Sequence, residues 1–444
     1  MITHPILSEL ANHGVRMGLS NLRRFLTHIG YHSDQCPFVI HVGGTNGKGS
    51  VCRMLESIYL DAGYKVGLYT SPHVQHVNER IRVSGQDIDS DQLSKLLEDT
   101  QQAASRWASL EGFDSEIPLT YFEMMTAVAI QYFAIEHADV VILEVGLGGR
   151  LDATNVVDST VSCIVSVDFD HMDVLGDDLS SIATEKAGII KDGQRVVLGT
   201  MTDSVNRVLR YIAGTKDAIV HQMGHQFHFS VHRDSLSFQS GIFRLEGVKV
   251  GLEGMHQCHN AALALEIVHT QQQVRPVTVS SMLRGLAQVK HSGRLEWLTE
   301  TILLDAAHNP AGADKLAEYL TEIRKDSERP VTLLLGCSRE KDLRSISVIL
   351  GGVVDRIFAT HCSHPRAKSS SDIVREVKVD TPIFDMGDVE NAIQHCRWGE
   401  ELIVVAGSIF LVGAVKDIWE QKSSVFEVND VCNSEGSDSS TLSS

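Results

Sequence analysis

The chain has 444 residues, of which 43% are apolar and 22% are charged, the composition of a globular protein large enough for two or three domains. No apolar run approaches the roughly 20 residues of a membrane-spanning helix, and the first residues lack the pattern of a secretion signal. The net charge of −18 argues against a nucleic-acid or anionic-membrane surface, and the eight cysteines form no C-x-x-C pair, so we expect a reduced, cytoplasmic protein without nucleic-acid or membrane partners.

Residues 38–70 predict a strand, a glycine-rich loop, a helix and a second strand. The runs 38–42 and 65–69 are apolar enough for buried strands. Between them, apolar residues recur at the spacing of one helical face, at Val51, Met54, Leu55, Ile58 and Ala62. Gly63 follows as a helix C-cap. Two strands joined through a helix are expected to pair in parallel.

Further apolar runs predict an open parallel sheet in the same domain. They cover residues 140–145, 161–167 and 195–198, with segments between them that can form helices. From His225 to Val250 the pattern changes to short period-two runs, which predict a small antiparallel sheet that closes this domain.

After Lys290 the alternation of strands and helices starts again. Buried strands are expected at residues 302–304, 331–335, 355–359 and 402–405. From Lys422 on, the chain is rich in serine and acidic residues and has too little apolar surface to fold. The predicted fold class is therefore α/β, with a phosphate-loop parallel-sheet domain carrying a small antiparallel sheet at 1–290, a Rossmann-like α/β domain at 296–421 and a disordered tail at 422–444.

A glycine-rich loop joins the first predicted strand to the first helix. Its residues are Gly44, Thr45, Asn46, Gly47, Lys48, Gly49 and Ser50. Such a loop directs several backbone N–H groups at one point beside a helix N-terminus, where phosphate binds. Lys48 can reach the outer phosphates, and the Ser50 hydroxyl can ligate magnesium. The extra Gly49 departs from the common G-x-x-x-x-G-K-[ST] pattern, but the strand and helix on either side favour an ATP site over an ordinary turn.

Glu144 ends the predicted strand 140–145 at the edge where open α/β sheets bind ligands. Magnesium prefers oxygen ligands, and the glycines that follow imply a close backbone approach. We therefore expect Glu144 to be a magnesium ligand rather than half of an ordinary ion pair. His171, after the strand 161–167, belongs to the same edge, although a lone histidine there is more often structural.

These motifs resemble the folylpolyglutamate synthase and dihydrofolate synthase family, relatives of the Mur ligases. The resemblance covers roughly residues 15 to 420. Its ordered blocks are Gly44 to Ser50 (GTNGKGS), Thr70 to Ile81 (TSPHVQHVNERI), Glu144 to Asn155 (EVGLGGRLDATN), Asp170-His171, Glu185 to Lys191 (EKAGIIK) and Asp305 to Pro310 (DAAHNP). It implies a Mur-ligase-type ATP-binding domain at 1–290 and a glutamate-ligase domain at 296–421. The implied reaction is phosphorylation of a carboxylate by ATP, followed by attack of the glutamate amino group on the acyl phosphate.

The resemblance also implies roles for single residues. Two magnesium ions are implied, one held by Ser50 at ATP and one surrounded by Ser71, Glu144 and His171. Lys48, His171 and Lys186 form the implied catalytic set. Lys186 would be carbamylated, which turns an ammonium into a carboxylate-like group; without the resemblance it would be read as a helix-surface lysine paired with an acid.

Later segments supply further implied contacts. The nucleotide contacts are Asn260, Arg294, Asp305 and His308, which would place the site between the two domains, with a hinge near residues 290–298. Ser408 would lie beside the incoming glutamate, or serve only as a helix N-cap. Ala306 replaces the glycine of the usual D-G-A-H motif, which matters only if its φ is positive.

The segment 119–123 bears on the substrate. It resembles the bifunctional members of the family, in which the phenylalanine, here Phe122, packs against a pterin ring; the alternative is an ordinary residue of a helix core. Arg80, Asp152 and Ala153 are further implied substrate contacts. We expect a monomeric enzyme that uses dihydropteroate, reduced folates and L-glutamate, and the alternative is a monofunctional folylpolyglutamate synthase.

Two other function classes fit less well. A Mur-type peptide ligase shares the phosphate loop, but the block at 70–81 argues against it. A GTPase-like switch would need an N-K-x-D motif, and residues 155–158 lack its lysine. Four histidines in the predicted antiparallel region could suggest a metal site. No cysteine or carboxylate lies at the spacing of metal ligands, so we expect no metal there. The four histidines are His221, His225, His228 and His232.

Overall fold

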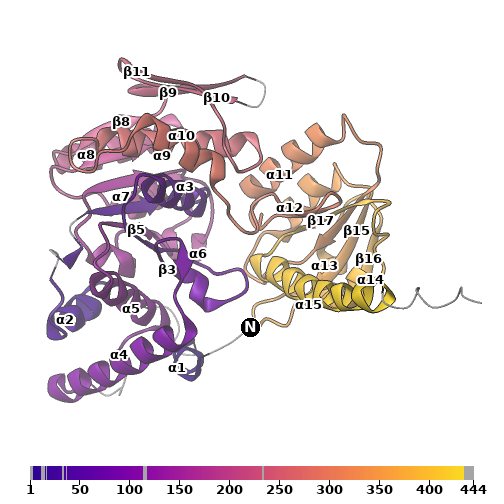
Figure 1. Cartoon of the computed structure of the whole chain (residues 1–444), viewed down its shortest axis with the longest axis horizontal. Coiled ribbons are helices and arrows are strands. Elements are labelled where there is room, and N and C mark those ends of the chain that lie inside the picture. The colour runs from indigo at the N-terminus through magenta and orange to yellow at the C-terminus, as the bar shows by residue number, and fades with distance from the viewer. Residues whose placement is uncertain are drawn as a thin grey trace, which may run out of the picture. The chain divides into compact units, whose positions relative to one another are not determined.

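The computed structural model describes residues 4–11, 16, 18–32, 35–36, 38–113, 118–232 and 235–434, with side chains described up to residue 421. The chain divides into two compact units, Met1–His291 and Ser292–Ser444, each built on its own sheet (Figure 1). The second unit starts at Ser292, ahead of its first strand, which begins at Glu296. The residues before this strand bond within the unit: the Gly293 N–H donates to Glu296 Oε2 at 2.7 Å, and the Leu295 N–H donates to Asp305 Oδ2 at 2.9 Å. Within the described ranges, no helix combines the length and the apolar character needed to cross a membrane.

The first unit contains an eight-stranded sheet that positions the phosphate loop. Its strands are β1 (Val39–Gly43), β2 (Val66–Tyr69), β3 (Ile81–Val83), β4 (Gln86–Asp87), β5 (Val140–Glu144), β6 (Val161–Ile164), β7 (Arg195–Leu198) and β8 (Ile219–Gln222). Their order is β4-β3-β2-β5-β1-β6-β7-β8. The six strands from β2 to β8 in this order pair in parallel, and only the edge strands β3 and β4 are antiparallel. The predicted parallel sheet is thus present, and β1 lies near its middle.

Helices cover both faces of this sheet (Figure 1). They are α1 (Pro5–Leu10), α2 (Ser20–His28), α3 (Lys48–Asp61), α4 (Ser90–Glu111), α5 (Tyr121–Ile135), α6 (Met172–Leu175), α7 (Leu179–Ala187), α8 (Asp203–Thr215), α9 (Met255–Thr270) and α10 (Val279–Gln288), with 3-10 turns η3 (Val77–Arg80) and η4 (Ala153–Val156). Successive strand residues point to opposite faces. In β5, Val140 and Ile142 therefore pack with α3, α9 and α10, whereas Val141 and Leu143 pack with α4 and α5.

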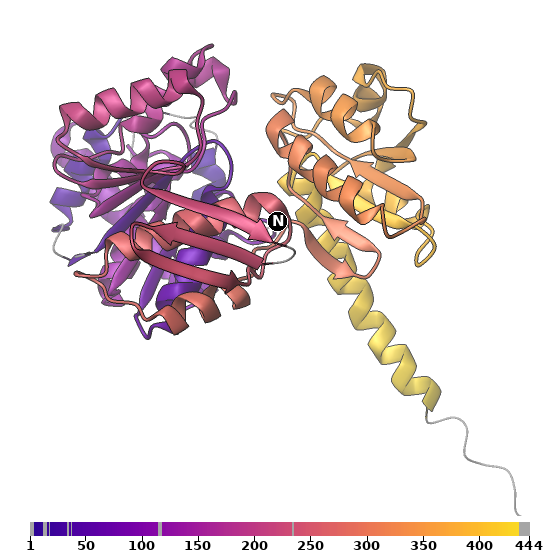
Figure 2. The ribbon, with the colours of Figure 1, turned by 90° about the horizontal axis from the view of Figure 1, so that it is seen from above.

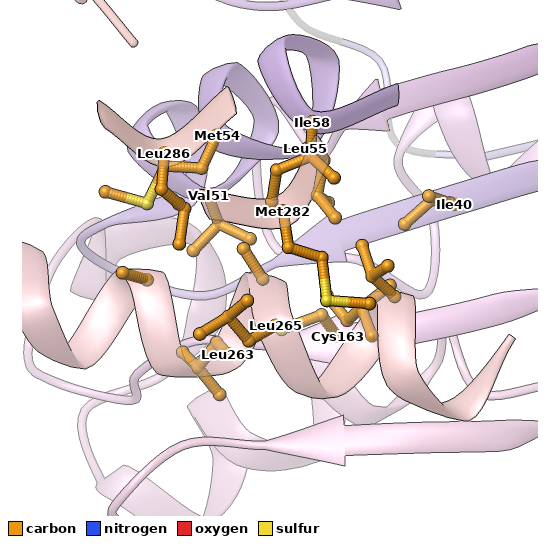
Figure 3. Close-up of a cluster of buried hydrophobic side chains, with 14 of the residues drawn as sticks. Ile40, Val51, Met54, Leu55, Ile58, Cys163, Leu263, Leu265, Met282 and Leu286 are labelled. Carbon is orange, nitrogen blue, oxygen red and sulfur yellow. The ribbon is translucent and has the colours of Figure 1, made fainter. Parts of the chain in front are cut away.

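The face under the phosphate loop has a dense apolar core (Figure 3). Val51, Leu55 and Ile58 of α3 are fully buried against side chains from α9 and α10. The predicted helical face is therefore the packed face. Gly63 has φ +86° directly after the last turn of α3, which agrees with its predicted role as a C-cap.

A separate three-stranded antiparallel sheet lies against the same core. Its strands are β9 (Phe227–His232), β10 (Ser235–Ser240) and β11 (Phe243–Val248), in the order β11-β10-β9. Leu236, Phe238 and Leu245 contribute to the core that contains α9, and Figure 2 shows the sheet as a layer of its own on the first unit. This confirms the predicted small antiparallel sheet.

The second unit repeats the α/β principle with a six-stranded sheet. Its strands are β12 (Glu296–Thr299), β13 (Ile302–Leu304), β14 (Val331–Leu335), β15 (Arg356–His361), β16 (Ile383–Asp388) and β17 (Leu402–Ala406). Its helices are α11 (Pro310–Ile323), α12 (Leu343–Gly351), α13 (Ser370–Glu376), α14 (Val389–Gln394) and α15 (Ile409–Ser434). The order is β12-β13-β17-β14-β15-β16, with only β12 antiparallel to its neighbour.

The last helix differs from the sequence prediction. Helix α15 continues to Ser434, so the disordered tail predicted to begin at residue 422 begins no earlier than residue 435. A helix that is already formed propagates at a lower cost than a new one nucleates, and Leu411, Val412 and Val415 bury the first turns of α15. Residues 435–444 of the predicted tail lie outside the described residues.

Candidate active site

The phosphate loop connects β1 to α3 in the middle of the sheet. Gly44 and Gly47 have φ values of +142° and +84°, a backbone region that L side chains rarely adopt. A Cβ on Gly44 would lie 3.0 Å from the Ser166 nitrogen, and one on Gly47 would lie 2.6 Å from Asn260 Oδ1. Both positions therefore need glycine for its backbone freedom and for its small size.

The loop is held by the segment that follows β6. The Thr45 N–H donates to the Ser166 carbonyl at 2.9 Å, and the Asn46 N–H donates to Ser166 Oγ at 2.9 Å. The Thr45 hydroxyl also donates to the Asp168 carbonyl at 3.2 Å and accepts from the Asp168 N–H at 3.0 Å. These bonds fix the loop in a curled shape over the edge of the sheet.

Lys48 folds back over this loop. Its Nζ donates to the carbonyl oxygens of Gly44 at 3.1 Å and Thr45 at 3.2 Å. An ammonium in this position lies where the outer phosphates of a nucleotide would meet the loop. The first turn of α3 adds its backbone N–H groups and the positive end of the helix dipole, which favour an anion at the same point.

Ser50 and Glu144 offer oxygen ligands beside the loop. Both are buried, Ser50 in the first turn of α3 and Glu144 at the end of β5. A Cβ on Gly49 would lie 3.7 Å from Glu144 Oε1, so this carboxylate faces the loop. The Ser71 N–H donates to Glu144 Oε2 at 3.0 Å and orients it. A hydroxyl and a carboxylate suit magnesium, which usually keeps phosphate and water oxygens as its other ligands.

No three side chains of His, Cys, Asp or Glu gather in a metal cluster within the described ranges. A metal here would therefore depend on phosphate oxygens as well as on Ser50 and Glu144. His171 is the N-cap residue of α6 and has φ +49°, with a side chain 38% exposed. Its Nε2 lies 3.9 Å from Asp170 Oδ1.

Lys186 lies in the last turn of α7 and is 4% exposed. Burial, together with the nearby Lys48 ammonium, lowers the pKa of Lys186 from 10.5 to about 7, although Asp170, Asp168 and Asp152 act in the opposite direction. The structure thus contradicts the alternative of an exposed helix-surface lysine. A lysine with this pKa is largely a neutral amine at slightly alkaline pH, which is the form that reacts with electrophiles.

The glycine segment after β5 brings its loop against α7. A Cβ on Gly149 would lie 2.8 Å from the Glu185 carbonyl oxygen, and the Arg150 N–H donates to the same oxygen at 2.7 Å. The close approach predicted from the glycines is therefore present.

Asp152 and Ala153 have mainly structural contacts in this loop. Asp152 Oδ2 accepts from the Leu147 N–H at 2.8 Å, and its Oδ1 accepts from the Thr154 N–H at 3.0 Å as the N-cap of η4. Burial raises the pKa of Asp152 above its ordinary value, and its hydrogen bonds offset only part of this rise. Thr154 Oγ1 lies 2.8 Å from Nε2 of the buried His41 in β1. Ala153 is buried in the core with α4 and α5.

Phe122 lies at the start of α5, across from the end of β5. Thr120 and Glu123 form a capping box, with the Glu123 N–H donating to Thr120 Oγ1 at 3.3 Å and the Thr120 N–H donating to Glu123 Oε2 at 2.8 Å. The cap fixes Phe122, whose half-buried ring lies 5.9 Å from the Tyr69 ring.

Arg80 belongs to the same neighbourhood as the start of α5. Its guanidinium carbon lies 5.4 Å from the centre of the Tyr121 ring, and its Nε lies 2.9 Å from His73 Nδ1. The predicted substrate residues Arg80 and Phe122 thus flank one helix terminus.

Asn260 is brought to the phosphate loop by the first turns of α9. It is buried, its Nδ2 donates to Gln257 Oε1 at 2.9 Å, and its Oδ1 faces Gly47 as described above. The sequence offered no local signal for this approach, because more than 200 residues separate Asn260 from Gly47 along the chain.

The second unit holds the other predicted nucleotide residues. Burial raises the pKa of Asp305 above its ordinary value, and the nearby Arg294 offsets only part of this rise. Asp305 Oδ1 accepts from the Ala307 N–H at 2.8 Å, and His308 Nδ1 lies 2.8 Å from the Ala306 carbonyl oxygen. Ala306 does not have a positive φ, so it replaces glycine without strain.

Ser408 shows the geometry of the N-cap alternative. It is buried before α15, and its Oγ accepts from the Phe410 N–H at 3.2 Å. The two units are described separately, and the predicted arrangement of their residues around one nucleotide stays a prediction.

Two contributors near the phosphate loop were missed by sequence reasoning. Asp168 interacts electrostatically with Lys186 and bonds the loop through Thr45. His291 places Nδ1 3.3 Å from Ser50 Oγ. Asp168 had a weak signal, since it follows a predicted strand at the ligand edge, whereas His291 had none.

Both units match known domain models. Residues 42–268 match the Mur ligase middle domain, and residues 293–409 match the Mur ligase, glutamate ligase domain. The dihydrofolate synthase/folylpolyglutamate synthase of Escherichia coli (strain K12) is 31% identical over 420 residues, which cover 94% of this chain and 95% of that protein.

Solved structures give the same result. The structure of E. coli FolC in complex with DHPP and ADP has a TM-score of 0.84 and 30% identity, covering 95% of this chain and 99% of that one. A bifunctional folylpolyglutamate synthase/dihydrofolate synthase with Mn, AMPPNP and L-glutamate bound has a TM-score of 0.81 and 31% identity, covering 94% and 98%.

Proposed function

Because this chain belongs to the dihydrofolate synthase/folylpolyglutamate synthase family, we propose that it is an ATP-dependent ligase that joins L-glutamate to dihydropteroate and to the γ-carboxylate of reduced folates. The similar structures bind DHPP, ADP, L-glutamate, and Mn with AMPPNP, which are the ligands that such a reaction needs. ATP, magnesium, dihydropteroate, reduced folates and L-glutamate are the corresponding partners of this chain.

The observation that carries the proposal is the grouping at the carboxyl edge of the first sheet. The phosphate loop with Lys48, the oxygen ligands Ser50 and Glu144, and the buried Lys186 all lie there. A nucleotide switch also needs the phosphate loop and magnesium ligands, but it has no need for the buried Lys186. A buried lysine with a low pKa beside the loop indicates chemistry on a second group.

The reaction has two steps. A carboxylate oxygen of the pteroate or folate attacks the γ-phosphorus of ATP, and ADP leaves. The amino nitrogen of glutamate then attacks the acyl carbon, loses a proton, and displaces phosphate. Magnesium held by Ser50 at ATP, and a second ion held with Glu144, would neutralise phosphate charge, and Lys48 adds positive charge where negative charge accumulates.

The remaining implied roles belong to the same proposal. Asn260, Arg294, Asp305 and His308 contact the nucleotide, Ser71 and His171 help to hold the second metal, and Ser408 contacts glutamate. Arg80, Asp152 and Ala153 contact the acceptor substrate. Asp152 supports this role indirectly, because its carboxylate shapes the loop between Leu147 and Thr154.

Phe122 favours a bifunctional enzyme over a monofunctional one. Its half-buried ring lies beside Tyr69, and the guanidinium of Arg80 lies over Tyr121, the next residue. Flat aromatic faces next to a cation suit a planar pterin with a carboxylate at its far end. Phe122 is half-buried at the start of α5, whereas Met124 and Met125 further along the same helix are fully buried.

Lys186 is proposed to be carbamylated. Its neutral amine attacks CO2, a nitrogen–carbon bond forms, and a proton leaves to solvent. The product carries a negative charge beside Lys48, whereas the unmodified ammonium is disfavoured there by burial and by the same Lys48.

A ligation assay with products resolved by mass tests the function. The purified protein receives ATP, magnesium, glutamate and either dihydropteroate or a reduced folate. We expect one added glutamate on each acceptor. A product from the folate alone would leave a folylpolyglutamate synthase, and no ligation of either acceptor would remove the proposed function.

We also propose a cytoplasmic location. The seven cysteines whose side chains the structure describes are free thiols, six of them buried, which suits a reducing compartment.

A further inference from the structure

His291 contacts the serine that is proposed to hold magnesium. It is the last residue of the first unit, and its Nδ1 lies 3.3 Å from Ser50 Oγ. Ser50 lies in the first turn of α3 and is 3% exposed. The contact joins residues 241 positions apart in the chain.

The unusual glycine of the phosphate loop makes room for this imidazole. A Cβ on Gly49 would lie 2.8 Å from His291 Cε1 and 3.2 Å from its Nε2. The first distance is shorter than real Cβ atoms tolerate, so any side chain at residue 49 would displace the ring. The glycine between Lys48 and Ser50 therefore has a specific neighbour.

The backbone next to His291 is fixed to the same helix. Arg53 Nε donates to the Lys290 carbonyl oxygen at 3.1 Å, and its NH1 group pairs with Glu56 at 2.6 Å. Glu56 is buried and also pairs with Arg82 at 3.0 Å. Since Ser50, Arg53 and Glu56 all belong to α3, the imidazole and the hydroxyl are held in one rigid frame.

We propose that His291 is a positioning residue for the metal–nucleotide site. A serine that ligates a cation through its oxygen must direct its hydroxyl hydrogen elsewhere, and His291 Nδ1 accepts it. The hydroxyl lone pairs are then already oriented toward the cation, and Ser50 does not have to change its rotamer when the cation binds. The inference rests on the proposed function, because it concerns the metal site of the same reaction.

Three substitutions separate acceptor geometry from bulk. His291→Asn places an amide oxygen as many bonds from Cβ as Nδ1 is, His291→Gln places it one bond further, and His291→Leu fills the space without an acceptor. The readout is the affinity of Mn²⁺ for the protein–ADP complex, measured by electron paramagnetic resonance, with ADP affinity without metal and thermal unfolding as controls.

We expect Leu and Gln to weaken Mn²⁺ binding about fivefold to tenfold, the effect of one lost hydrogen bond, and Asn to stay within about twofold of the unaltered protein. ADP affinity without metal should not change. In the double-mutant cycle, Ser50→Ala with His291→Leu should bind Mn²⁺ no more weakly than Ser50→Ala alone.

Unchanged Mn²⁺ affinity in His291→Leu would overturn the inference. So would a loss in His291→Asn equal to that in His291→Leu, or additive losses in the cycle. These measurements use no folate and no glutamate, so they can succeed where the ligation assay fails, and the two proposals fail separately.

Discussion

Phe122 and Gly146 face each other so closely that a Cβ on Gly146 would lie 2.5 Å from Phe122 Cζ. Gly146 follows Glu144, the proposed metal ligand, by two residues, so the ring lies against the loop that leaves the reacting edge. This contact relates the proposed pterin site to the proposed phosphoryl-transfer site through one glycine.

Phe122→Ala is expected to impair dihydropteroate more than reduced folate. Loss of an aromatic contact of about 1 to 3 kcal/mol corresponds to a rise in KM for dihydropteroate of roughly 5-fold to 150-fold. Steady-state kinetics with both acceptors measures it. Equal losses with both acceptors would contradict a separate pterin site. Thermal unfolding of the variant checks that such losses do not come from a protein that has unfolded.

Gly47→Ala should abolish nucleotide binding. The new Cβ would lie 2.6 Å from Asn260 Oδ1 and 2.8 Å from Val165 Cγ1, so the loop must open. Gly63→Ala is the matched control: its φ of +86° is nearly the same as the +84° of Gly47, but a Cβ there meets nothing within 4 Å. Both variants should lose about 1 kcal/mol of stability from the strained backbone, and only Gly47→Ala should lose ADP binding by calorimetry. ADP binding lost in both, or kept in both, contradicts this account of the loop.

Lys48→Ala and Glu144→Ala should each reduce ligation at least about 100-fold while the fold stays intact, because each removes charge stabilisation of phosphoryl transfer. Circular dichroism and thermal unfolding check the fold. Lys315→Ala is the control, since Lys315 pairs with Glu318 on the surface of α11. Ligation by either site variant within about tenfold of the unaltered protein would remove that residue from the machinery.

Lys186 predicts a pH dependence of stability in CO2-free buffer. The folded protein binds the Lys186 proton with a pKa of about 7, and the ordinary value of 10.5 applies in the unfolded chain. Between these values the unfolded state holds more protons, so the free energy of unfolding should rise with pH from about 7 to 10. Urea unfolding at pH 7 and pH 9 should show this rise in the unaltered protein relative to Lys186→Met. If the unaltered protein and Lys186→Met differed in unfolding free energy by the same amount at pH 7 and pH 9, the lowered pKa of Lys186 would be contradicted.

Added bicarbonate gives a second readout at Lys186. We expect intact mass under non-acidic conditions to show one bound CO2 in the unaltered protein and none in Lys186→Met, with ligation rising as the adduct forms. Full activity without the adduct would show that the amine itself serves the reaction.

The sequence predicted the elements whose signals are local. The strands β1, β5 and β7 are rich in buried apolar residues, and the glycines and the lysine of the loop between β1 and α3 are close together in sequence. The edge strands were missed because they are short or partly exposed: β4 has two exposed residues, and β8 begins with the half-exposed Ile219. A strand that buries only one side leaves no clear apolar run.

The site shows the same division. Ser50 and Glu144 could be proposed from the motifs around them, whereas the neighbours that make them effective come from distant segments. His291 beside Ser50 and Asn260 beside Gly47 depend on tertiary packing, which no local pattern encodes. The low pKa of Lys186 arises from burial, so the sequence alone favoured a surface lysine.

The central claim is that ATP activates a carboxylate as an acyl phosphate. The most direct measurement uses dihydropteroate with oxygen-18 in its carboxylate, together with ATP, magnesium and glutamate, followed by mass analysis of the released phosphate. We predict one oxygen-18 in each phosphate, because the oxygen that attacks the γ-phosphorus leaves with it when glutamate displaces the acyl group. Phosphate that carries no label while the amide product forms would contradict the claim.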